Sequence, residues 1–89
     1  MKKTACVLIN YRDPTEVLRL YKSVRDCRWP EKEIYVVDNG SGPEIAAKIR
    51  TELGEANTIV LPVNVGYAGG LNAGIRFALA HGADFLWLL

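Results

Sequence analysis

The stretch Asn64-Val65-Gly66-Tyr67-Ala68-Gly69-Gly70-Leu71-Asn72-Ala73-Gly74-Ile75 decides how the rest of the chain is interpreted. It follows an apolar run at residues 58–61 that is typical of a strand, and it precedes a segment with helical periodicity. Glycine has no Cβ, so such a turn can adopt positive φ and let a ligand approach the backbone. The first N–H groups of the following helix lack intrahelical partners. The stretch therefore predicts either a turn that binds phosphate or diphosphate, or a loop that needs glycine only for its shape.

Three more apolar segments alternate with segments of helical periodicity on either side of this stretch. The expected strands are residues 5–9, 34–37, 58–61 and 85–89. Continuous apolar runs suit strands that are buried on both faces, as in parallel sheets. Strands that alternate with helices predict an α/β fold, in which helices cover the faces of a parallel sheet.

Each expected helix has a start signal or an apolar face, or both. Asp13 is placed to cap the first helix, with Pro14 at its first position and Glu16 at the capping-box position. Pro43 opens the second helix, and Gly54 is placed to end it. The apolar faces are Val17, Leu20, Tyr21 and Val24, then Ile45, Ile49 and Leu53, then Leu71, Ile75, Ala78 and Leu79. The polar residues Arg19, Lys22, Ser23 and Arg25 are interpreted as a solvated face rather than a binding patch.

Size and composition restrict the class of protein. The 89 residues form at most one small domain, 1–89, and the 49% hydrophobic content is typical of a folded chain. A net charge of +1 gives no electrostatic footprint for nucleic acid, so no nucleic-acid partner is expected. Cys6 and Cys27 lack metal-ligand spacing and are expected to be free thiols of a cytoplasmic protein. No apolar run approaches the ~18–20 residues of a membrane-spanning helix.

Polar residues follow three of the expected strands. They are Asn10-Tyr11-Arg12, then Asp38-Asn39-Gly40-Ser41 in an expected turn, and then the glycine-rich turn that starts at Asn64. Ligands of parallel α/β sheets bind beyond the carboxyl ends of the strands, where the strand order reverses. Asp38 can accept a hydrogen bond from a base imide or a ribose hydroxyl there, and Tyr11 can stack on a base. The turn from Gly66 to Asn72 can contact diphosphate or ribose.

Other phosphate-binding motifs do not fit the chain. A dinucleotide fingerprint needs GxGxxG directly after the first strand, where this chain has Asn10-Tyr11-Arg12-Asp13-Pro14. No GxxxxGK[ST] sequence is present, which excludes a P-loop. The acidic residues that a phosphoacceptor receiver needs after its first strand are also absent.

Three sequence motifs occur in order along the chain. They are Val7-Leu8-Ile9-Asn10-Tyr11, Val36-Val37-Asp38-Asn39-Gly40-Ser41, and the part of the glycine-rich stretch from Asn64 to Gly74. Together they resemble the N-terminal part of family-two glycosyltransferases, which have the GT-A fold, and the resemblance covers essentially the whole chain. The third motif, N-x-G-[FY]-A-G-G-x-N-x-G, is most similar to that of the rhamnosyltransferase-type branch.

The resemblance implies a Rossmann-like GT-A half-domain with strand order 3-2-1-4. It implies that Asp38 contacts the base of a UDP- or dTDP-sugar, that the backbone near Asn10 and Tyr11 lines the base site, and that residues 66–72 hold ribose and phosphates. The expected nucleotide-binding residues are Asn10, Tyr11, Asp38, Asn39, Ser41, Gly66, Tyr67, Gly69, Gly70 and Asn72. The implied reaction transfers the sugar to an acceptor hydroxyl, of a glycan or a lipid-linked acceptor, with inversion.

The chain also differs from the family pattern. The family's metal-binding DxD-type motif follows the fourth strand, and the general base comes later still, whereas this chain ends at Leu89. We therefore expect a half-domain truncated at the fourth strand and inactive by itself, because it lacks ligands for the divalent metal (Mg²⁺ or Mn²⁺) and a catalytic base. Arg12 is a second difference, since Asn is frequent at that position.

Two classes of function are compatible with these observations. The resemblance suggests a transferase of bacterial cell-surface polysaccharide biosynthesis on the cytoplasmic side, with membrane association of the full-length protein left open. The alternative is a non-catalytic α/β module that binds a nucleotide or a protein. The bare apolar strand at residues 85–89 motivates this alternative, because an exposed strand edge invites self-association.

Overall fold

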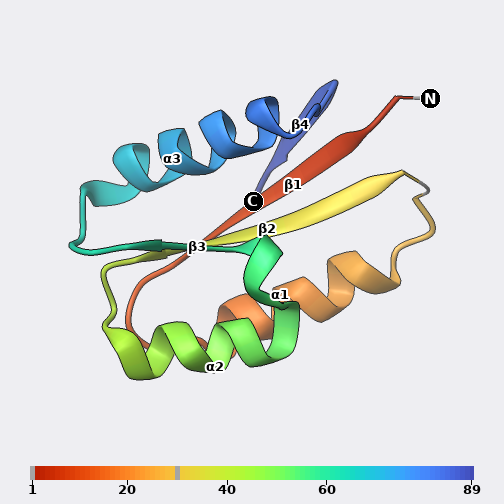
Figure 1. Ribbon diagram of the computed structural model, residues 1–89. Coiled ribbons are helices and arrows are strands. Elements are labelled where there is room, and N and C mark those ends of the chain that lie inside the picture. The colour runs from red at the N-terminus through yellow and green to blue at the C-terminus, as the bar shows by residue number, and fades with distance from the viewer. Residues whose placement is uncertain (1, 30) are drawn as a thin grey trace.

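Strands and helices alternate along the chain in the computed structural model, which describes residues 2–29 and 31–89 (Figure 1). The strands are β1 (Thr4–Asn10), β2 (Lys32–Asn39), β3 (Thr58–Leu61) and β4 (Phe85–Leu88). The α-helices are α1 (Thr15–Asp26), α2 (Pro43–Leu53) and α3 (Gly66–Ala80), and a short 3-10 helix, Glu55–Asn57, precedes β3. Over the described ranges, the predicted alternation of four strands with three α-helices is confirmed.

The four strands are parallel and form one sheet in the order β3-β2-β1-β4. β1 pairs with β2 along its whole length, from Thr4 opposite Lys32 to Asn10 opposite Asp38. β3 pairs with the carboxyl-terminal half of β2, and β4 pairs with the amino-terminal part of β1. The predicted α/β fold and strand order 3-2-1-4 are confirmed. The strand order reverses between β1 and β4, because the chain first builds the sheet from β1 toward β3 and then returns.

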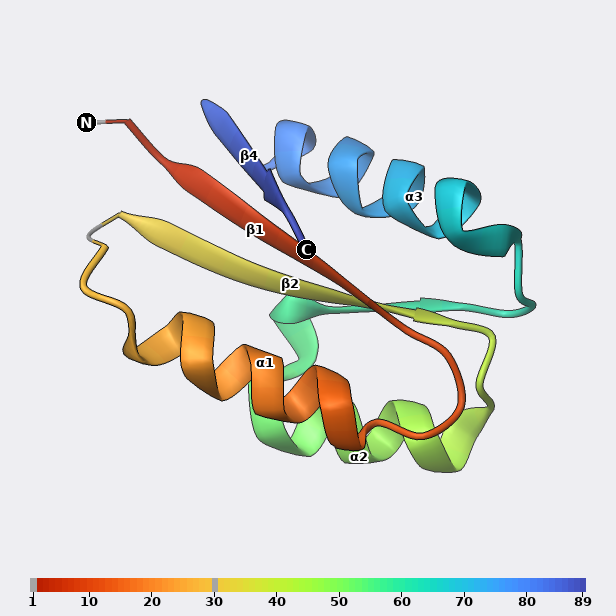
Figure 2. The ribbon, with the colours of Figure 1, turned by 180° about the vertical axis from the view of Figure 1, so that it is seen from behind.

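Helices cover both faces of the sheet, which explains why the strands are continuous apolar runs. Figures 1 and 2 show α1 and α2 on one face and α3 on the other. On the first face, Cys6 and Leu8 of β1 pack with Val17 of α1. On the second, Ala5 and Val7 of the same strand belong to a cluster with Ala78 of α3. Alternate residues of β1 therefore supply two separate hydrophobic clusters.

The first helix begins one residue later than expected. α1 starts at Thr15, because the Leu18 N–H donates to the Pro14 carbonyl and makes Pro14 the capping residue. The Asp13 carboxylate still satisfies the helix start, since its Oδ1 accepts the Thr15 N–H over 2.9 Å. Glu16 pairs with Arg19 at 3.0 Å.

The second strand is longer than expected and includes residues that we predicted as a turn. β2 continues through Asp38 and Asn39, which lie opposite Asn10 on one side and opposite Val60 and Leu61 on the other. Neighbouring strands on both sides extend the ladder to these polar residues, a tertiary effect that their turn propensity does not reveal. The turn itself begins at Gly40, whose φ is 77°.

The third helix begins within the glycine-rich stretch rather than after it. α3 starts at Gly66, so the expected turn residues from Tyr67 to Asn72 are helical. Gly70 and Gly74 are buried where the helix meets the sheet. A Cβ on Gly74 would lie 3.0 Å from Val37 Cγ2 and would overlap Val7. Close helix–sheet packing therefore explains glycine at this position, despite its low helix propensity.

The thiols and helix lengths complete the description of residues 2–29 and 31–89. Cys6 and Cys27 are free thiols, the first buried and the second exposed. Burial raises the pKa of the Cys6 thiol. None of the described helices combines the length and apolar character that crossing a membrane requires.

Candidate functional site

The carboxyl ends of β1 and β2 carry a polar cluster formed by Asn10 and Asp38, which are buried, and Ser41, which is half-buried. The Asn10 Nδ2 group donates to Asp38 Oδ1 over 3.1 Å, and the Ser41 backbone N–H donates to Asp38 Oδ2 over 3.2 Å. The exposed fraction of Asp38 is 0%, and that of Asn10 is 4%. These hydrogen bonds offset part of the cost of burying the carboxylate. In this structure Asp38 therefore joins the ends of two strands and does not face solvent.

Arg12 is bonded to this cluster through its backbone. Its N–H donates to Ser41 Oγ over 2.6 Å, and its carbonyl accepts from Asn10 Nδ2 over 3.3 Å. Its φ is 68°, in the left-handed region, which costs a residue with a Cβ roughly 1–2 kcal/mol. Asn tolerates this region better than other non-glycine residues. The conformation accounts for the Asn that the resembling family often has at this position.

Tyr11 presents an exposed aromatic ring beside the cluster. The exposed fraction of Tyr11 is 44%, and the Arg12 guanidinium carbon lies 5.0 Å from the centroid of its ring. Hydrogen bonding and attraction from Arg12 lower the pKa of the Tyr11 hydroxyl, and the Asn64 side chain contributes through a further hydrogen bond. Tyr11 therefore connects the end of β1 to the loop between β3 and α3.

Asn39 connects the end of β2 to the same loop. Its Oδ1 accepts the Val65 N–H over 3.0 Å, and its Nδ2 donates to the Gly66 carbonyl over 2.9 Å. A Cβ on Gly70 would lie only 2.9 Å from Asn39 Nδ2. The buried amide of Asn39 and the bare backbone of Gly70 therefore fit each other, and both help to place the first turn of α3.

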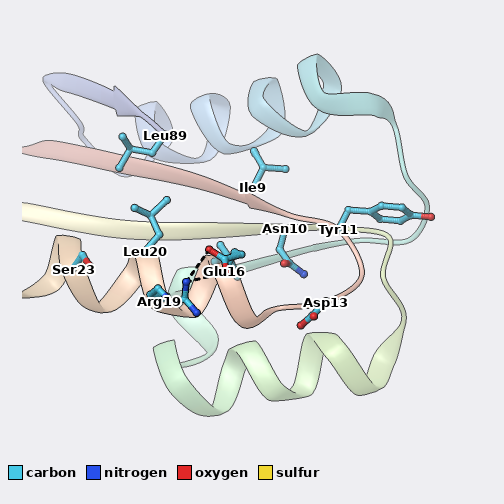
Figure 3. A pocket seen from close by; sticks show the side chains of 10 residues that line it. Ile9, Asn10, Tyr11, Asp13, Glu16, Arg19, Leu20, Ser23 and Leu89 are labelled. Carbon is cyan, nitrogen blue, oxygen red and sulfur yellow. Dashed lines mark hydrogen bonds and ion pairs between the residues drawn. The ribbon is translucent and has the colours of Figure 1, made fainter.

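A cavity of about 560 Å³ lies between α1 and the carboxyl ends of β1 and β4 (Figure 3). Its volume is in the range of small-molecule sites. It lies at the reversal of strand order, where ligands of open α/β sheets bind. Its lining residues are Ile9, Asn10, Tyr11, Asp13, Glu16, Val17, Arg19, Leu20, Ser23 and Leu89.

The sequence-predicted site residues fall into two groups around this cavity. Asn10 and Tyr11 line it, and Asp38 and Ser41 are hydrogen-bonded to the segment that contains them. The second group is at the start of α3, on the opposite face of the sheet and outside the cavity lining, and Asn39 holds it in place. The second group consists of Gly66, Tyr67, Gly69, Gly70 and Asn72.

Sequence reasoning missed the contribution of α1 to the cavity. Glu16, Arg19 and Ser23 line it, although two of them were interpreted only as part of a solvated face. Their side chains are exposed, as expected for a solvated face, but all three lie on the same side of α1, next to the cavity. Positions 16, 19, 20 and 23 have the i, i+3, i+4, i+7 spacing of a single helix face, which is the signal that was available.

The described residues do not form a metal site by themselves. Over residues 2–29 and 31–89, no group of three or more His, Cys, Asp or Glu side chains comes together as a metal ion requires. The carboxylate of Asp38 is bonded to Asn10 and Ser41, and that of Asp13 accepts from Thr15. The divalent metal that the resemblance implies therefore does not fit the side chains described here.

The fold and the site together define a class of protein. A parallel sheet with helices on both faces, a cavity at the reversal of strand order, and polar residues at the ends of β1 and β2 are typical of α/β proteins that bind nucleotides. The sequence narrows this class, since residues 5–89 match Glycosyl transferase family 2. The chain belongs to Glycosyl transferase family 2. No curated protein and no solved structure gave a significant match.

Membership of this family supports glycosyltransferase activity in general. It also implies a nucleotide-sugar donor and a glycan acceptor in general terms. The four-stranded parallel sheet in the order 3-2-1-4 is consistent with a Rossmann-like half-domain of the GT-A type.

Proposed function

We propose that this chain is the nucleotide-binding part of a glycosyltransferase that uses a UDP- or dTDP-sugar as its donor. The observation that carries the proposal is the Asn10–Asp38–Ser41 cluster beside a cavity at the reversal of strand order. Hydrogen-bonding groups at this edge of a parallel sheet suit the polar edge of a base, and an exposed aromatic ring suits its face.

In this proposal the residues around the cavity, Asn10, Tyr11, Asp38 and Ser41, bind the base or support its site. The Tyr11 ring stacks on it, and the Asn10 segment lines its edge. The Asp38 carboxylate accepts the imide N–H of uracil or thymine, which both bases share. Because Asp38 is buried under the Asn10–Arg12 segment, that segment has to shift for direct contact. Asn39 and Ser41 hold the two neighbouring loops in place.

The second group binds the ribose and the diphosphate. Gly66 leaves the backbone at the start of α3 open to close approach, and Tyr67 and Asn72 are exposed at the same end of the helix. Gly69 and Gly70 lie in the first turn of the helix, where Gly70 packs against Asn39. The Asn72 amide offers both a donor and an acceptor. Asn39 sets the position of this helix start relative to β2.

The proposed reaction transfers the sugar to an acceptor hydroxyl with inversion, as in the rhamnosyltransferase-like branch and in cell-surface polysaccharide synthesis. The acceptor is a glycan or a lipid-linked glycan, and the protein acts on the cytoplasmic side of the membrane. A divalent metal, when bound, neutralises the diphosphate leaving group. We propose that its ligands and the catalytic base are not among these 89 residues, so that the chain alone binds the donor without transferring the sugar.

An amide NMR titration of the chain with UDP and then dTDP, each with and without Mn²⁺, tests this proposal. We expect shifts concentrated at residues 10–11, 38–41 and 66–72, and we expect them without the metal. The stronger of the two ligands identifies the preferred base. A well-dispersed spectrum in which neither nucleotide moves these signals would contradict the proposal.

A second candidate function is a non-catalytic module that associates with itself. β4 is an edge strand, and the exposed fractions of Phe85 and Leu88 are 57% and 41%. An exposed apolar edge can pair with another chain. Sedimentation at increasing concentration distinguishes the two candidates, since a stable dimer that Leu88→Lys disrupts would favour the module.

A further inference from the structure

Arg12 lies at the candidate site, and the proposed function leaves it without a role. Its chain neighbours Tyr11 and Asp13 both line the cavity. Its own side chain is exposed, and its backbone φ of 68° is in the left-handed region. Such strained conformations persist where the surrounding structure imposes them, and they are concentrated at functional sites.

The contacts that impose this conformation involve only the backbone of Arg12. Its N–H donates to Ser41 Oγ over 2.6 Å, and its carbonyl accepts from Asn10 Nδ2 over 3.3 Å. Neither hydrogen bond depends on the identity of the side chain. Asn or Gly would adopt the same φ with less strain. These backbone contacts therefore explain the conformation at this position but not the presence of an arginine.

The guanidinium lies close to the place that the proposed function gives to the base. It is 5.0 Å from the centroid of the Tyr11 ring, which the proposed function assigns to the base. In a nucleotide only the ribose separates the base from the first phosphate. A guanidinium held against the platform of the base is therefore within reach of the phosphate oxygens.

The charge of Arg12 is also available to a ligand. Arg19, the cation on the α1 side of the cavity, is paired with Glu16 at 3.0 Å. Arg12, by contrast, makes no ion pair with a carboxylate from residues 2–29 or 31–89. The planar guanidinium presents parallel N–H donors that match two phosphate oxygens, a geometry that a lysine ammonium does not offer.

We propose that Arg12 is a specificity-determining residue that binds the diphosphate of the nucleotide donor. The inference rests on the proposed function, because it requires that the base binds at Tyr11. Arg12 then favours ligands that carry a diphosphate over the bare nucleoside. It contributes through its charge and its fork of donors, and not through the stability of the fold.

Isothermal titration of the full chain with UDP and with uridine tests this role, and the preferred base replaces uracil if dTDP binds more tightly. We compare the wild type with Arg12→Asn, which keeps a residue suited to positive φ, and with Arg12→Lys, which keeps the charge. Arg28→Asn, an exposed position at the opposite end of α1, is the matched control for loss of one positive charge. Thermal unfolding of each variant is measured in parallel.

We expect Arg12→Asn to weaken UDP binding roughly tenfold or more and to leave uridine binding within about twofold, because only UDP carries the phosphates. Arg12→Lys is expected to be intermediate, and Arg28→Asn to match the wild type. The melting temperature of Arg12→Asn should equal or exceed that of the wild type, a result that a merely structural role would not produce.

The outcomes separate this inference from the proposed function. If the wild type binds UDP or dTDP but Arg12→Asn binds it equally well, the role of Arg12 is wrong and the proposed function stands. Equal losses for UDP and uridine would also overturn the role, because they would place Arg12 at the base rather than at the diphosphate. A wild type that binds neither nucleotide would overturn both, and an unfolded Arg12→Asn would show that the arginine is structural.

Discussion

Gly40 and Arg12 both adopt positive φ beside the candidate site, but their side-chain requirements differ. At Gly40, φ is 77°, and an added Cβ would lie 2.7 Å from Val63 Cα and would overlap the backbone of Asn64. Glycine is therefore needed there for conformation and for space. At Arg12 the side chain is exposed, so the position accepts a Cβ and only its backbone is strained. Two neighbouring loops thus meet at Gly40, whereas the exposed side chain at position 12 meets no such steric limit.

Substitution of Gly40 should destabilise the protein more than substitution of a glycine that also has positive φ but has open space around it. We expect Gly40→Ala to lower the free energy of unfolding by about 3 kcal/mol or more, combining left-handed strain with a backbone clash. Gly82, with φ of 87° and no atom near an added Cβ, is the control, and Gly82→Ala should lose about 1 kcal/mol. Urea unfolding measures both. Equal losses would mean that the contact between residue 40 and the β3–α3 loop is not maintained in solution.

Helix α3 is placed by its glycines and by one side chain from β2. Gly70 and Gly74 bring the helix axis close to the sheet, where any Cβ would meet Asn39, Val37 or Val7. The Asn39 amide accepts from the Val65 N–H and donates to the Gly66 carbonyl, the pattern by which a neighbouring strand would pair with this segment. The polar contacts of Asn39 consequently fix where the helix starts. The missing side chains of Gly70 and Gly74 set how closely the helix approaches the sheet.

Variants of Asn39 should loosen the start of α3 in a graded way. Asn39→Leu removes both hydrogen bonds, so we expect a loss of about 2–4 kcal/mol and faster hydrogen exchange at the Val65 amide. Asn39→Asp keeps the acceptor for that amide and loses the donor to Gly66, so Val65 should stay protected while stability still falls by about 1–3 kcal/mol. Exchange at Ala78, in the last turn of the same helix, serves as the internal control. Unchanged protection at Val65 in Asn39→Leu would refute the role of Asn39.

The whole molecule consists of one sheet with a separate hydrophobic cluster on each face. Tyr35 belongs to the cluster on the α3 side, where it packs edge-on against Phe77 with ring centroids 5.2 Å apart. Burial, and to a smaller extent the charge of Glu33, raise the pKa of the Tyr35 hydroxyl. The neutral phenol is therefore the form that the folded state favours.

The raised pKa of Tyr35 predicts a loss of stability at alkaline pH. Because the folded-state pKa lies above the unfolded one, the contribution of Tyr35 is complete below about pH 10 and is lost as the pH rises through the folded-state pKa. Urea unfolding between pH 8 and pH 11 should show a steeper decline for the wild type than for Tyr35→Phe. The pKa of Cys6 is also raised, and the loss of stability that it causes at alkaline pH is the same in both proteins. Parallel curves for the two proteins would show that Tyr35 is not buried in solution.

Several features of this protein were determined by the sequence itself. The positions of the strands and helices follow from apolar runs, helical periodicity and the prolines at residues 14 and 43, because these are local properties. The α/β class followed from their alternation. The family, and with it the strand order, followed from three motifs whose order and spacing are encoded directly in the chain.

Other features were decided only by the tertiary structure, because they depend on what lies opposite each residue. Asp38 and Asn39 read as a turn by composition, yet pairing with Asn10 and Leu61 keeps them in β2. The glycine-rich stretch was expected to be a turn, but most of it is helix, and its Gly74 packs tightly against Val7 and Val37.

The candidate site also combines features that the sequence predicted with features that depend on the tertiary partners of each residue. The sequence placed polar residues after each strand, since strand ends are locally recognisable. Only the folded sheet shows that the Asp38 carboxylate is buried between Asn10 and Ser41, and that α1 supplies one wall of the cavity. Burial and hydrogen-bond partners are properties of pairs of distant residues, and a linear pattern contains no information on which pairs will meet until the sheet is assembled.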